Sequence, residues 1–213
     1  MYEAEAIELH GEKVFALHVP RLLRENARAG RKIALTFDDV PNGHTREILA
    51  VLKEFEVRAT FFLIGAQVVR HPELARSIVA AGHEIGNHSF SHVLTRNCTE
   101  EAILEDIAKA EKVILEATGC VPLYFRPPTG LVTQSVQRAC GKLGYSIVLW
   151  SVDSEDWKAE DDDAVITRVL ENIRPGAIVL LHPLPRTVRV LPQILRGLKR
   201  RGYEIVPVSA LFE

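Results

Sequence analysis

The chain has 213 residues, of which 47% are hydrophobic and 25% are charged, with a formal net charge of -2. This balance predicts one soluble globular domain, and the low charge excludes a general electrostatic attraction to nucleic acid or anionic membranes. No run of 18 apolar residues occurs, so we expect no membrane span. The acidic opening Met1-Tyr2-Glu3 lacks a secretory signal. We therefore expect a cytoplasmic protein, or an extracellular or cell-envelope protein if a leader has been trimmed away.

The first 31 residues have a pattern of their own. Two short apolar runs indicate a β-hairpin over residues 7–17, and residues 22–29 have the composition of one or two helical turns. We expect residues 1–31 to form an appendage packed on a domain made by residues 32–213.

From Lys32 onward, strand-like and helix-like patterns alternate. The expected strands are 32–37, 58–64, 83–87, 122–126, 145–151, 177–181 and 203–206. The expected helices are 45–55, 72–81, 100–118, 133–143, 162–173 and 190–200. Nearly continuous apolar strands are typical of parallel strands covered by helices. Because a closed eight-unit barrel takes ~250 residues, we predict an α/β fold with an irregular or incomplete (β/α) barrel of seven or eight mostly parallel strands; an open doubly wound sheet is the alternative.

Unusual polar residues gather where these strands end. They are Asp38, Asp39, His88, His92, Arg126, Asp153, Asp156, Trp157 and His182. In parallel α/β folds the carboxyl ends of the strands meet on one face, where active sites are built. A buried strand that ends on two carboxylates also needs a group to share their charge, because an unpaired buried carboxylate is costly. A metal ion would meet that need.

The segment His88–His92 supplies matching ligands. Its spacing of four residues would place both imidazoles on one side of a helical turn, within reach of one ion. Two histidines and one aspartate form a common three-ligand set that leaves positions open for water and substrate. No Glu follows His88, which excludes the zinc-protease pattern His-Glu-x-x-His.

Five segments, in this order, resemble the motifs of the polysaccharide deacetylases, which are carbohydrate esterase family 4 and contain the NodB homology domain. The segments are Thr36–Asp39, His88–His92, Arg126–Gly130, Asp153–Trp157 and Leu180–His182. The resemblance implies a divalent metal held by Asp39, His88 and His92, with zinc as the expected ion and cobalt as a substitute. It implies that Asp38 is the general base, a choice that the residues alone leave open between the two aspartates.

The same resemblance implies roles for the later segments. His182 would protonate the leaving amine, with Asp156 as the carboxylate partner that raises its pKa. Arg126 would orient Asp38 and favour its ionised form. The backbone N–H of Thr129 would stabilise the oxyanion.

An acetyl pocket is also implied by the resemblance, with walls from Pro128, Trp157 and Leu180. Asp153 would either bond Arg126 or take part in catalysis. Two positions depart from the family pattern: Val40 stands where Gly is usual, and Thr129 stands where Tyr is usual.

The function implied is a metal-dependent hydrolase that removes acetyl groups from N-acetylated carbohydrates of the N-acetylglucosamine type. One alternative is a formyl-amide or cyclic-imide hydrolase on a related barrel, which the changes at Val40 and Thr129 would suit. The other is a glycan- or metal-binding module without catalysis, disfavoured because base, acid and ligands are all present. Stoichiometric metal and hydrolysis that is lost on chelation would discriminate these alternatives.

Overall fold

A computed structural model describes residues 6–9, 12–15, 19–93 and 97–213. Strands β1 (Ala6–Leu9) and β2 (Glu12–Phe15) pair antiparallel, which confirms the predicted hairpin strands. The assignment of residues 1–31 as a packed appendage stays a prediction.

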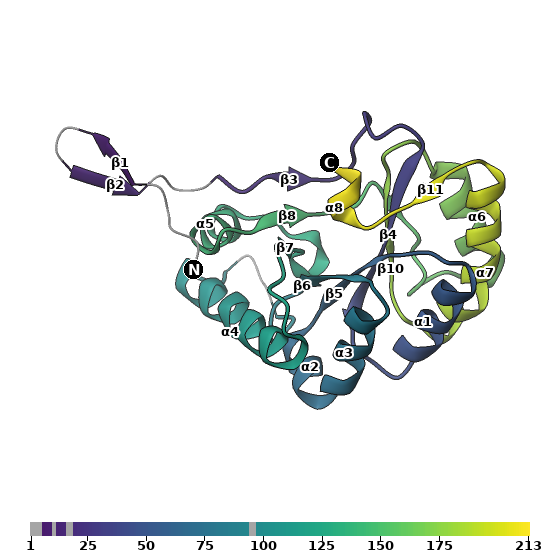
Figure 1. Ribbon diagram of the computed structural model, residues 1–213, viewed down its shortest axis with the longest axis horizontal. Coiled ribbons are helices and arrows are strands. Elements are labelled where there is room, and N and C mark those ends of the chain that lie inside the picture. The colour runs from purple at the N-terminus through teal and green to yellow at the C-terminus, as the bar shows by residue number, and fades with distance from the viewer. Residues whose placement is uncertain (1–5, 10–11, 16–18, 94–96) are drawn as a thin grey trace.

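The remaining strands form one sheet that curls around an interior (Figure 1). They are β3 (Leu22–Leu23), β4 (Lys32–Val40), β5 (Thr60–Leu63), β6 (Glu84–Asn87), β7 (Tyr124–Phe125), β8 (Ser146–Val148), β9 (Val152–Asp153), β10 (Ile178–Leu181) and β11 (Glu204–Ile205). Their order is β3-β8-β7-β6-β5-β4-β10-β9, with β11 beside β4, and every named pair is parallel. This arrangement confirms the predicted incomplete barrel.

The longer helices surround the curled sheet on its outer side, whereas the short C-terminal helix packs against the barrel interior through Val208 and Leu211 (Figure 1). They are α1 (Thr45–Glu54), α2 (Gly65–Arg70), α3 (Pro72–Ala80), α4 (Glu100–Thr118), α5 (Gln134–Leu143), α6 (Asp162–Asn172), α7 (Pro185–Arg200) and α8 (Val208–Leu211), with a short 3₁₀ turn, η1, at Pro128–Gly130. Neighbouring helices touch in the sequence α6, α7, α1, α3, α4, α5. A doubly wound sheet would carry helices on both faces, so that alternative is wrong.

The barrel is open where the chain passes from β8 to β9. The sequence predicted one strand over residues 145–151, but the chain changes partners within it: the N–H of Leu149 donates to Leu23, whereas the N–H of Ser151 donates to Ile178. The predicted helical turns at 22–29 are also wrong, because Leu22 and Leu23 form strand β3 along the edge of β8.

The two faces of β4 explain how the core positions the site. Ile33, Leu35 and Phe37 pack in the large apolar layer between sheet and helices, whereas Ala34 packs in the barrel interior. Because side chains alternate along a strand, Thr36 and Asp38 share the interior face with Ala34. Asp38 therefore points into the barrel because of its position in the strand.

The helix boundaries follow local signals where these are strong. Thr99 caps α4, its side chain accepting from the N–H of Ala102, and Gly119 ends that helix with φ 74°, as the sequence predicted. The prediction missed α2 and started α7 five residues late, because Pro185, a good first residue for a helix, was not used as a start signal.

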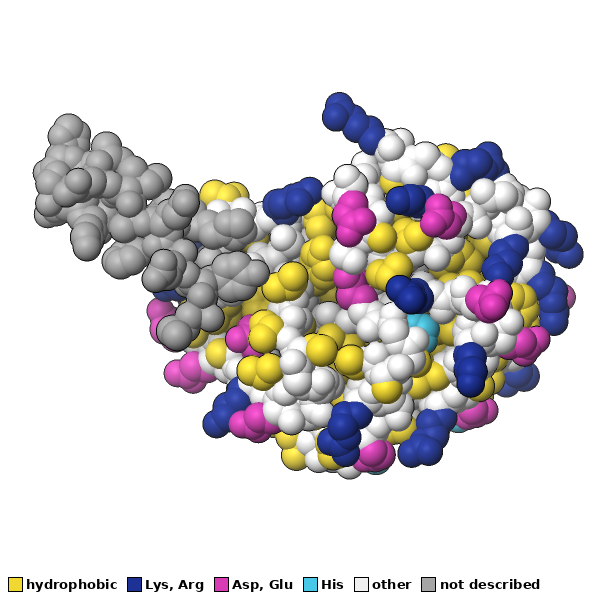
Figure 2. All heavy atoms as spheres, in the orientation of Figure 1, with side chains coloured by type: hydrophobic (Ala, Val, Ile, Leu, Met, Phe, Trp, Pro, Cys, Tyr) yellow, Lys and Arg dark blue, Asp and Glu magenta, His cyan; other side chains and the backbone are white. Residues whose placement is uncertain are grey.

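The surface is mixed in charge. Figure 2 shows basic and acidic side chains interspersed on the face in view, in keeping with the net charge of -2. Within the described part of the chain, no helix is long and apolar enough to cross a membrane.

Candidate active site and metal centre

Strand β4 brings two adjacent carboxylates to the same site. Successive side chains on a strand normally point to opposite faces. Here the register between β4 and β5 shifts between Phe37 and Val40, and Asp39 has φ 60°. This local distortion lets Asp39 turn toward the same end of the barrel as Asp38.

The two histidines come from a loop rather than a helix. The chain from His88 to His92 follows β6 without helical structure, and Ser89 and His92 have φ 68° and 58°. The expected helical turn is therefore wrong, although its consequence holds: the two imidazole centroids lie 4.9 Å apart.

Asp39, His88 and His92 converge on one point. Asp39 Oδ1 lies 3.6 Å from His88 Nε2 and 3.2 Å from His92 Nε2, and one ligand atom from each residue lies within 4.8 Å of the others. Among the described residues, Asp39 Oδ1 is the one buried side-chain oxygen or nitrogen without a hydrogen-bond partner. An unpaired buried oxygen is costly. Asp39 raises the pKa of His92, so a protonated His92 pairs with this oxygen, and a divalent cation would take that place with both rings neutral.

The tautomer of His88 also suits a metal ligand. Its Nδ1 donates to the carbonyl of Arg126 at 2.6 Å, so the neutral ring presents its Nε2 lone pair toward Asp38 and Asp39. Burial lowers the pKa of His88, which keeps the ring neutral. A lone pair facing two carboxylates is unfavourable without a cation, so the three residues fit a divalent metal.

Arg126 holds Asp38 from inside the barrel. The guanidinium is fully buried; its Nη1 donates to Asp38 Oδ1 and to Thr36 Oγ1, both at 2.7 Å. Its remaining N–H groups donate to the carbonyls of Val148 and Leu149 where the sheet opens. One oxygen of Asp38 is thereby fixed, and Oδ2 faces His88 Nε2 at 3.7 Å.

His182 stands on the other side of the site, after β10. Its Nδ1 lies 2.7 Å from Asp156 Oδ1, while Asp156 Oδ2 accepts from the N–H of His182 and from Thr187. Burial opposes the charged ring, but the hydrogen bond to Asp156 and the charges of Asp156, Asp38 and Asp39 outweigh it, so the pKa of His182 is raised. The pair predicted from the sequence is therefore in contact.

Thr129 adopts an unusual backbone conformation. It has φ 59° and ψ 8° in a turn closed by the N–H of Gly130 donating to Pro127 at 2.9 Å. A β-branched residue rarely adopts this conformation. Within the described residues, the N–H of Thr129 forms no hydrogen bond to another loop or strand.

The remaining predicted residues lie as follows. Pro128 and Leu180 are buried, and Trp157 is 62% exposed with Lys158 Nζ 5.2 Å from its ring. Asp153 accepts from the N–H of Glu155. Its expected bond to Arg126 is wrong, because the hydrogen bonds of Arg126 go to Asp38, Thr36 and two carbonyl groups.

Comparison with known proteins places this site in a family. The sequence model described as polysaccharide deacetylase matches residues 25–148, more than half of the chain. The chain belongs to the polysaccharide deacetylase family. This confirms the resemblance carried by the five segments, although the match itself ends before Asp153.

Individual members of the family match further along the chain. A peptidoglycan-N-acetylglucosamine deacetylase of Listeria monocytogenes is 39% identical over 189 residues, covering 87% of this chain; the chain spans 40% of that relative's length. A chitooligosaccharide deacetylase of Bradyrhizobium is 39% identical over 198 residues, covering 85% of this chain and 90% of the relative. A CE4 family pseudoenzyme from Bacillus anthracis has the same fold, with a TM-score of 0.86, 31% identity, and coverage of 91% of this chain and 69% of that one.

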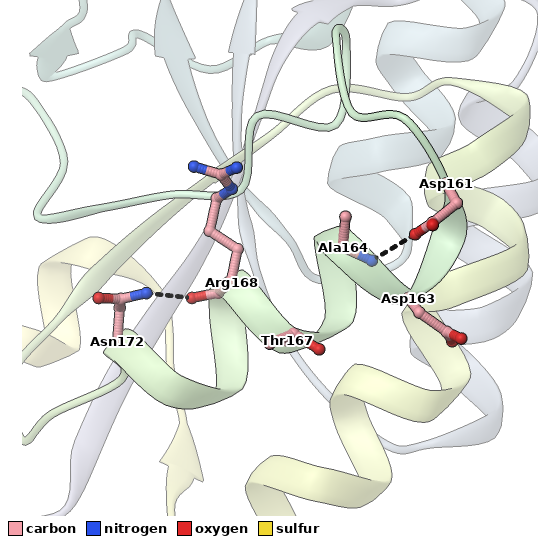
Figure 3. A pocket seen from close by; sticks show the side chains of 6 residues that line it. All are labelled: Asp161, Asp163, Ala164, Thr167, Arg168 and Asn172. Carbon is pink, nitrogen blue, oxygen red and sulfur yellow. Dashed lines mark hydrogen bonds between the residues drawn. The ribbon is translucent and has the colours of Figure 1, made fainter.

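A separate hollow of about 500 Å³ lies along α6 (Figure 3). Its lining includes Asp161, Asp163 and Arg168, and in Figure 3 the Asp161 side chain caps the helix by accepting from Ala164. None of the family's site residues lines it. Asp161 caps α6 and Arg168 pairs with Glu155, so we place the candidate chemistry at the Asp39 cluster.

Sequence reasoning missed the residues that hold the site together. Asn42 donates to the carbonyl of Pro183 at 3.1 Å and so ties the loop after Asp39 to the loop after His182. Asn87 and Asp106 support the histidine loop. Asn87 directly precedes His88, which is a weak signal; Asp106 lies inside a helical pattern that marks it only as polar.

Proposed function

We propose that this protein is a metal-dependent hydrolase that removes acetyl groups from N-acetylated carbohydrates. The observation that carries the proposal is the orphaned Asp39 oxygen between two imidazoles, with the Asp38 carboxylate and the His182 imidazole beside the same cluster. Membership of the family and relatives described as N-acetylglucosamine and chitooligosaccharide deacetylases support the same activity.

Asp39, His88 and His92 would hold the metal, with zinc as the proposed ion because imidazole and carboxylate ligands suit it. When bound, a divalent metal supplies Lewis-acid activation of water and of the acyl oxygen. Two residues of the chain, Asp38 and His182, then carry out the proton transfers.

Asp38 acts as the general base. Arg126 holds its Oδ1, which leaves Oδ2 to accept the proton of the attacking water. The new C–O bond forms at the acetyl carbonyl carbon, and the N–H of Thr129 donates to the oxygen that gains negative charge. Because it forms no hydrogen bond to another loop or strand among the described residues, this N–H is available for that bond.

His182 acts as the general acid. Asp156 holds its Nδ1 at 2.7 Å, so Nε2 is left to give a proton to the amine nitrogen as the C–N bond breaks. Acetate and a free amino sugar leave. Pro128, Trp157 and Leu180 would wall the acetyl group.

We further propose that the substrate is a glycan with N-acetylhexosamine units, the chemistry shared by the relatives described as acting on peptidoglycan and chitooligosaccharides. Those relatives also support action on a cell-envelope or extracellular glycan. The changes at Val40 and Thr129 alter the cleft rather than the proton-transfer groups, so they bear on substrate preference.

A substrate panel analysed by mass spectrometry tests the proposal. N-acetyl, O-acetyl, N-formyl and cyclic-imide compounds are incubated with metal-loaded protein, with and without chelator. We expect release of acetate from N-acetylglucosamine oligomers, lost on chelation. Turnover of formyl or imide substrates alone would favour the other hydrolase; binding of glycan without turnover would place the chain beside the pseudoenzyme from Bacillus anthracis.

A further inference from the structure

Side chains accept the hydrogen bonds of the backbone N–H groups in the histidine loop. Ser89 N–H donates to Asn87 Oδ1 at 2.8 Å, and His92 N–H donates to Ser89 Oγ at 2.9 Å. The two N–H groups between them, of Phe90 and Ser91, both donate to one carboxylate on α4. The carbonyls of Ser89 and Phe90 accept from the N–H groups of Gly65 and Ala66 at the start of α2, at 2.9 and 3.0 Å, so α2 and these side chains together fix the shape of the loop.

Asp106 is that carboxylate. Its Oδ2 accepts from the N–H of Phe90 at 2.9 Å, and its Oδ1 accepts from the N–H of Ser91 at 3.2 Å. Hydrogen bonds to an ionised acceptor are about twice as strong as neutral ones. Among the described residues, no cation forms an ion pair with Asp106; the nearby Lys109 instead has its Nζ 3.8 Å from the centroid of the Phe90 ring.

The two hydrogen bonds to Asp106 lie between the two histidines, so they bear on the orientation of His92. Phe90 and Ser91 are two of the three residues between His88 and His92, and the loop reaches His92 through left-handed backbone at Ser89 and at His92 itself. Such conformations persist only when surrounding contacts hold them. Without Asp106, two N–H groups would lose their acceptor and His92 could turn away from Asp39.

Helix α4 is a suitable anchor for the loop. Asn87 Nδ2 donates to the carbonyl of Ile107, so the loop is joined to α4 at both Asp106 and Ile107. Close packing adds to this: a side chain at Gly65 would collide with the Phe90 ring and with Ala110 of α4. Helix α4 thus contacts the loop before His88, through Asn87, and before His92, through Phe90 and Ser91.

We infer that Asp106 is a positioning residue of the metal centre, which sets the affinity for the divalent ion by holding His92 against His88 and Asp39. This inference rests on the proposed metal-dependent function. Outer partners that orient metal ligands typically contribute 10–100-fold in metal affinity, and Asp106 acts on the backbone of the ligand loop in the same sense.

The experiment compares Asp106→Ala and Asp106→Asn with Glu105→Ala, an exposed neighbour on the same helix. Zinc dissociation constants are measured by competition with a chromophoric chelator, and the visible absorption of the Co²⁺-loaded proteins reports ligand geometry. We expect Asp106→Ala to weaken zinc binding about 10–100-fold and to change the Co²⁺ spectrum. Asp106→Asn, which keeps one acceptor oxygen, should fall between Asp106→Ala and wild type.

The controls separate this inference from the function on which it rests. If wild-type protein binds no stoichiometric zinc, the proposed function fails. If wild type binds zinc and both Asp106 variants match Glu105→Ala in affinity and Co²⁺ spectrum, the positioning role is overturned. Thermal unfolding of the metal-free proteins shows whether the Asp106 variants fold, and Asp106→Asn keeps the test decisive if Asp106→Ala does not.

Discussion

The two rims of the barrel achieve left-handed backbone in different ways. At the rim where the helices end, glycine adopts it at Gly82, Gly119, Gly144 and Gly202, and Glu56 after α1 is the described non-glycine residue that does so. At the rim that carries the site, residues with side chains adopt it at Asp39, Ser89, His92, Thr129 and Glu155, beside the glycine at Gly130. Glycine does this without steric cost, whereas other residues lose of order 1–3 kcal/mol. Five of the six described non-glycine residues in this conformation lie at the rim of the site, so the strain is concentrated there.

The largest expected effect comes from removing the base at the strained rim. Asp38→Asn keeps the shape of the side chain and one acceptor for Arg126, but an amide cannot take a proton from water. We expect turnover of N-acetylglucosamine oligomers to fall by about 10²–10⁴-fold while zinc content stays stoichiometric, as measured by steady-state kinetics and metal analysis. His88→Ala is the matched contrast and should lose the metal. Full turnover by Asp38→Asn would remove Asp38 from the mechanism.

A second large effect is expected from the acid. His182→Ala should lower kcat by about 10²–10⁴-fold with zinc content unchanged. In wild type the pKa of His182 is raised, so the ring stays protonated at pH values where an ordinary histidine has lost its proton. We therefore expect kcat to fall only as the pH rises through that raised pKa. Asp156→Asn removes the carboxylate and should move this alkaline limb of the kcat profile to lower pH. An alkaline limb that Asp156→Asn leaves in place would show that another group donates the proton.

At the opposite rim, His83 should make stability pH-dependent. The ring is 8% exposed and its Nδ1 accepts from the N–H of Ala59. Burial and the charge of Arg58 lower its pKa from 6.5 to about 4. Below pH 6.5 His83 binds a proton in the unfolded chain but stays neutral in the folded chain, which favours unfolding. The contribution of neutral His83 to the free energy of unfolding is therefore fully present above pH 6.5. It is lost as the pH falls toward about 4, by roughly 3 kcal/mol in all.

Urea unfolding of chelator-treated protein at pH 7.5 and pH 4.5 measures that loss. His83→Asn places an amide oxygen near the position of Nδ1 and carries no titrating ring, so its free energy of unfolding should change less between the two pH values than that of wild type. His71→Asn, at a half-exposed histidine, should behave as wild type. Equal pH dependence in His83→Asn and wild type would mean that His83 titrates normally.

The same contrast between rims explains what the sequence could predict. Most apolar strands, and capped helices such as Thr99–Gly119, are set by local propensity, and the sequence predicted them correctly along with the parallel barrel. The site residues were found because parallel strands bring their ends together. The histidine loop was wrongly expected to be helical, because its shape depends on acceptors from Asn87 and from Asp106 on α4. The break between β8 and β9 was missed for a similar reason: the backbone changes partners across space.

The smallest expected effects are on the free energy of unfolding, and they test the difference in backbone strain between the two rims. Thr129 lies at the third position of a tight turn, where glycine is the usual residue because φ is positive. Thr129→Gly should relieve that strain, partly offset by the greater freedom of glycine in the unfolded chain, and raise the free energy of unfolding by about 1 kcal/mol. Gly119→Ala makes the reverse change in open space, since nothing lies within 4 Å of the added carbon, and should lower it by about 1 kcal/mol.

Urea unfolding of the metal-free variants measures both changes against the same wild type. Opposite signs would show that strain is stored at Thr129 in the site and avoided by glycine at the end of α4. Thr129→Gly also keeps the backbone N–H that we propose as the oxyanion donor, so any loss of kcat in this variant reports how firmly the turn aims that donor. If both substitutions destabilise the protein equally, the positive φ of Thr129 carries no stored strain, and the difference between the rims is one of side-chain chemistry alone.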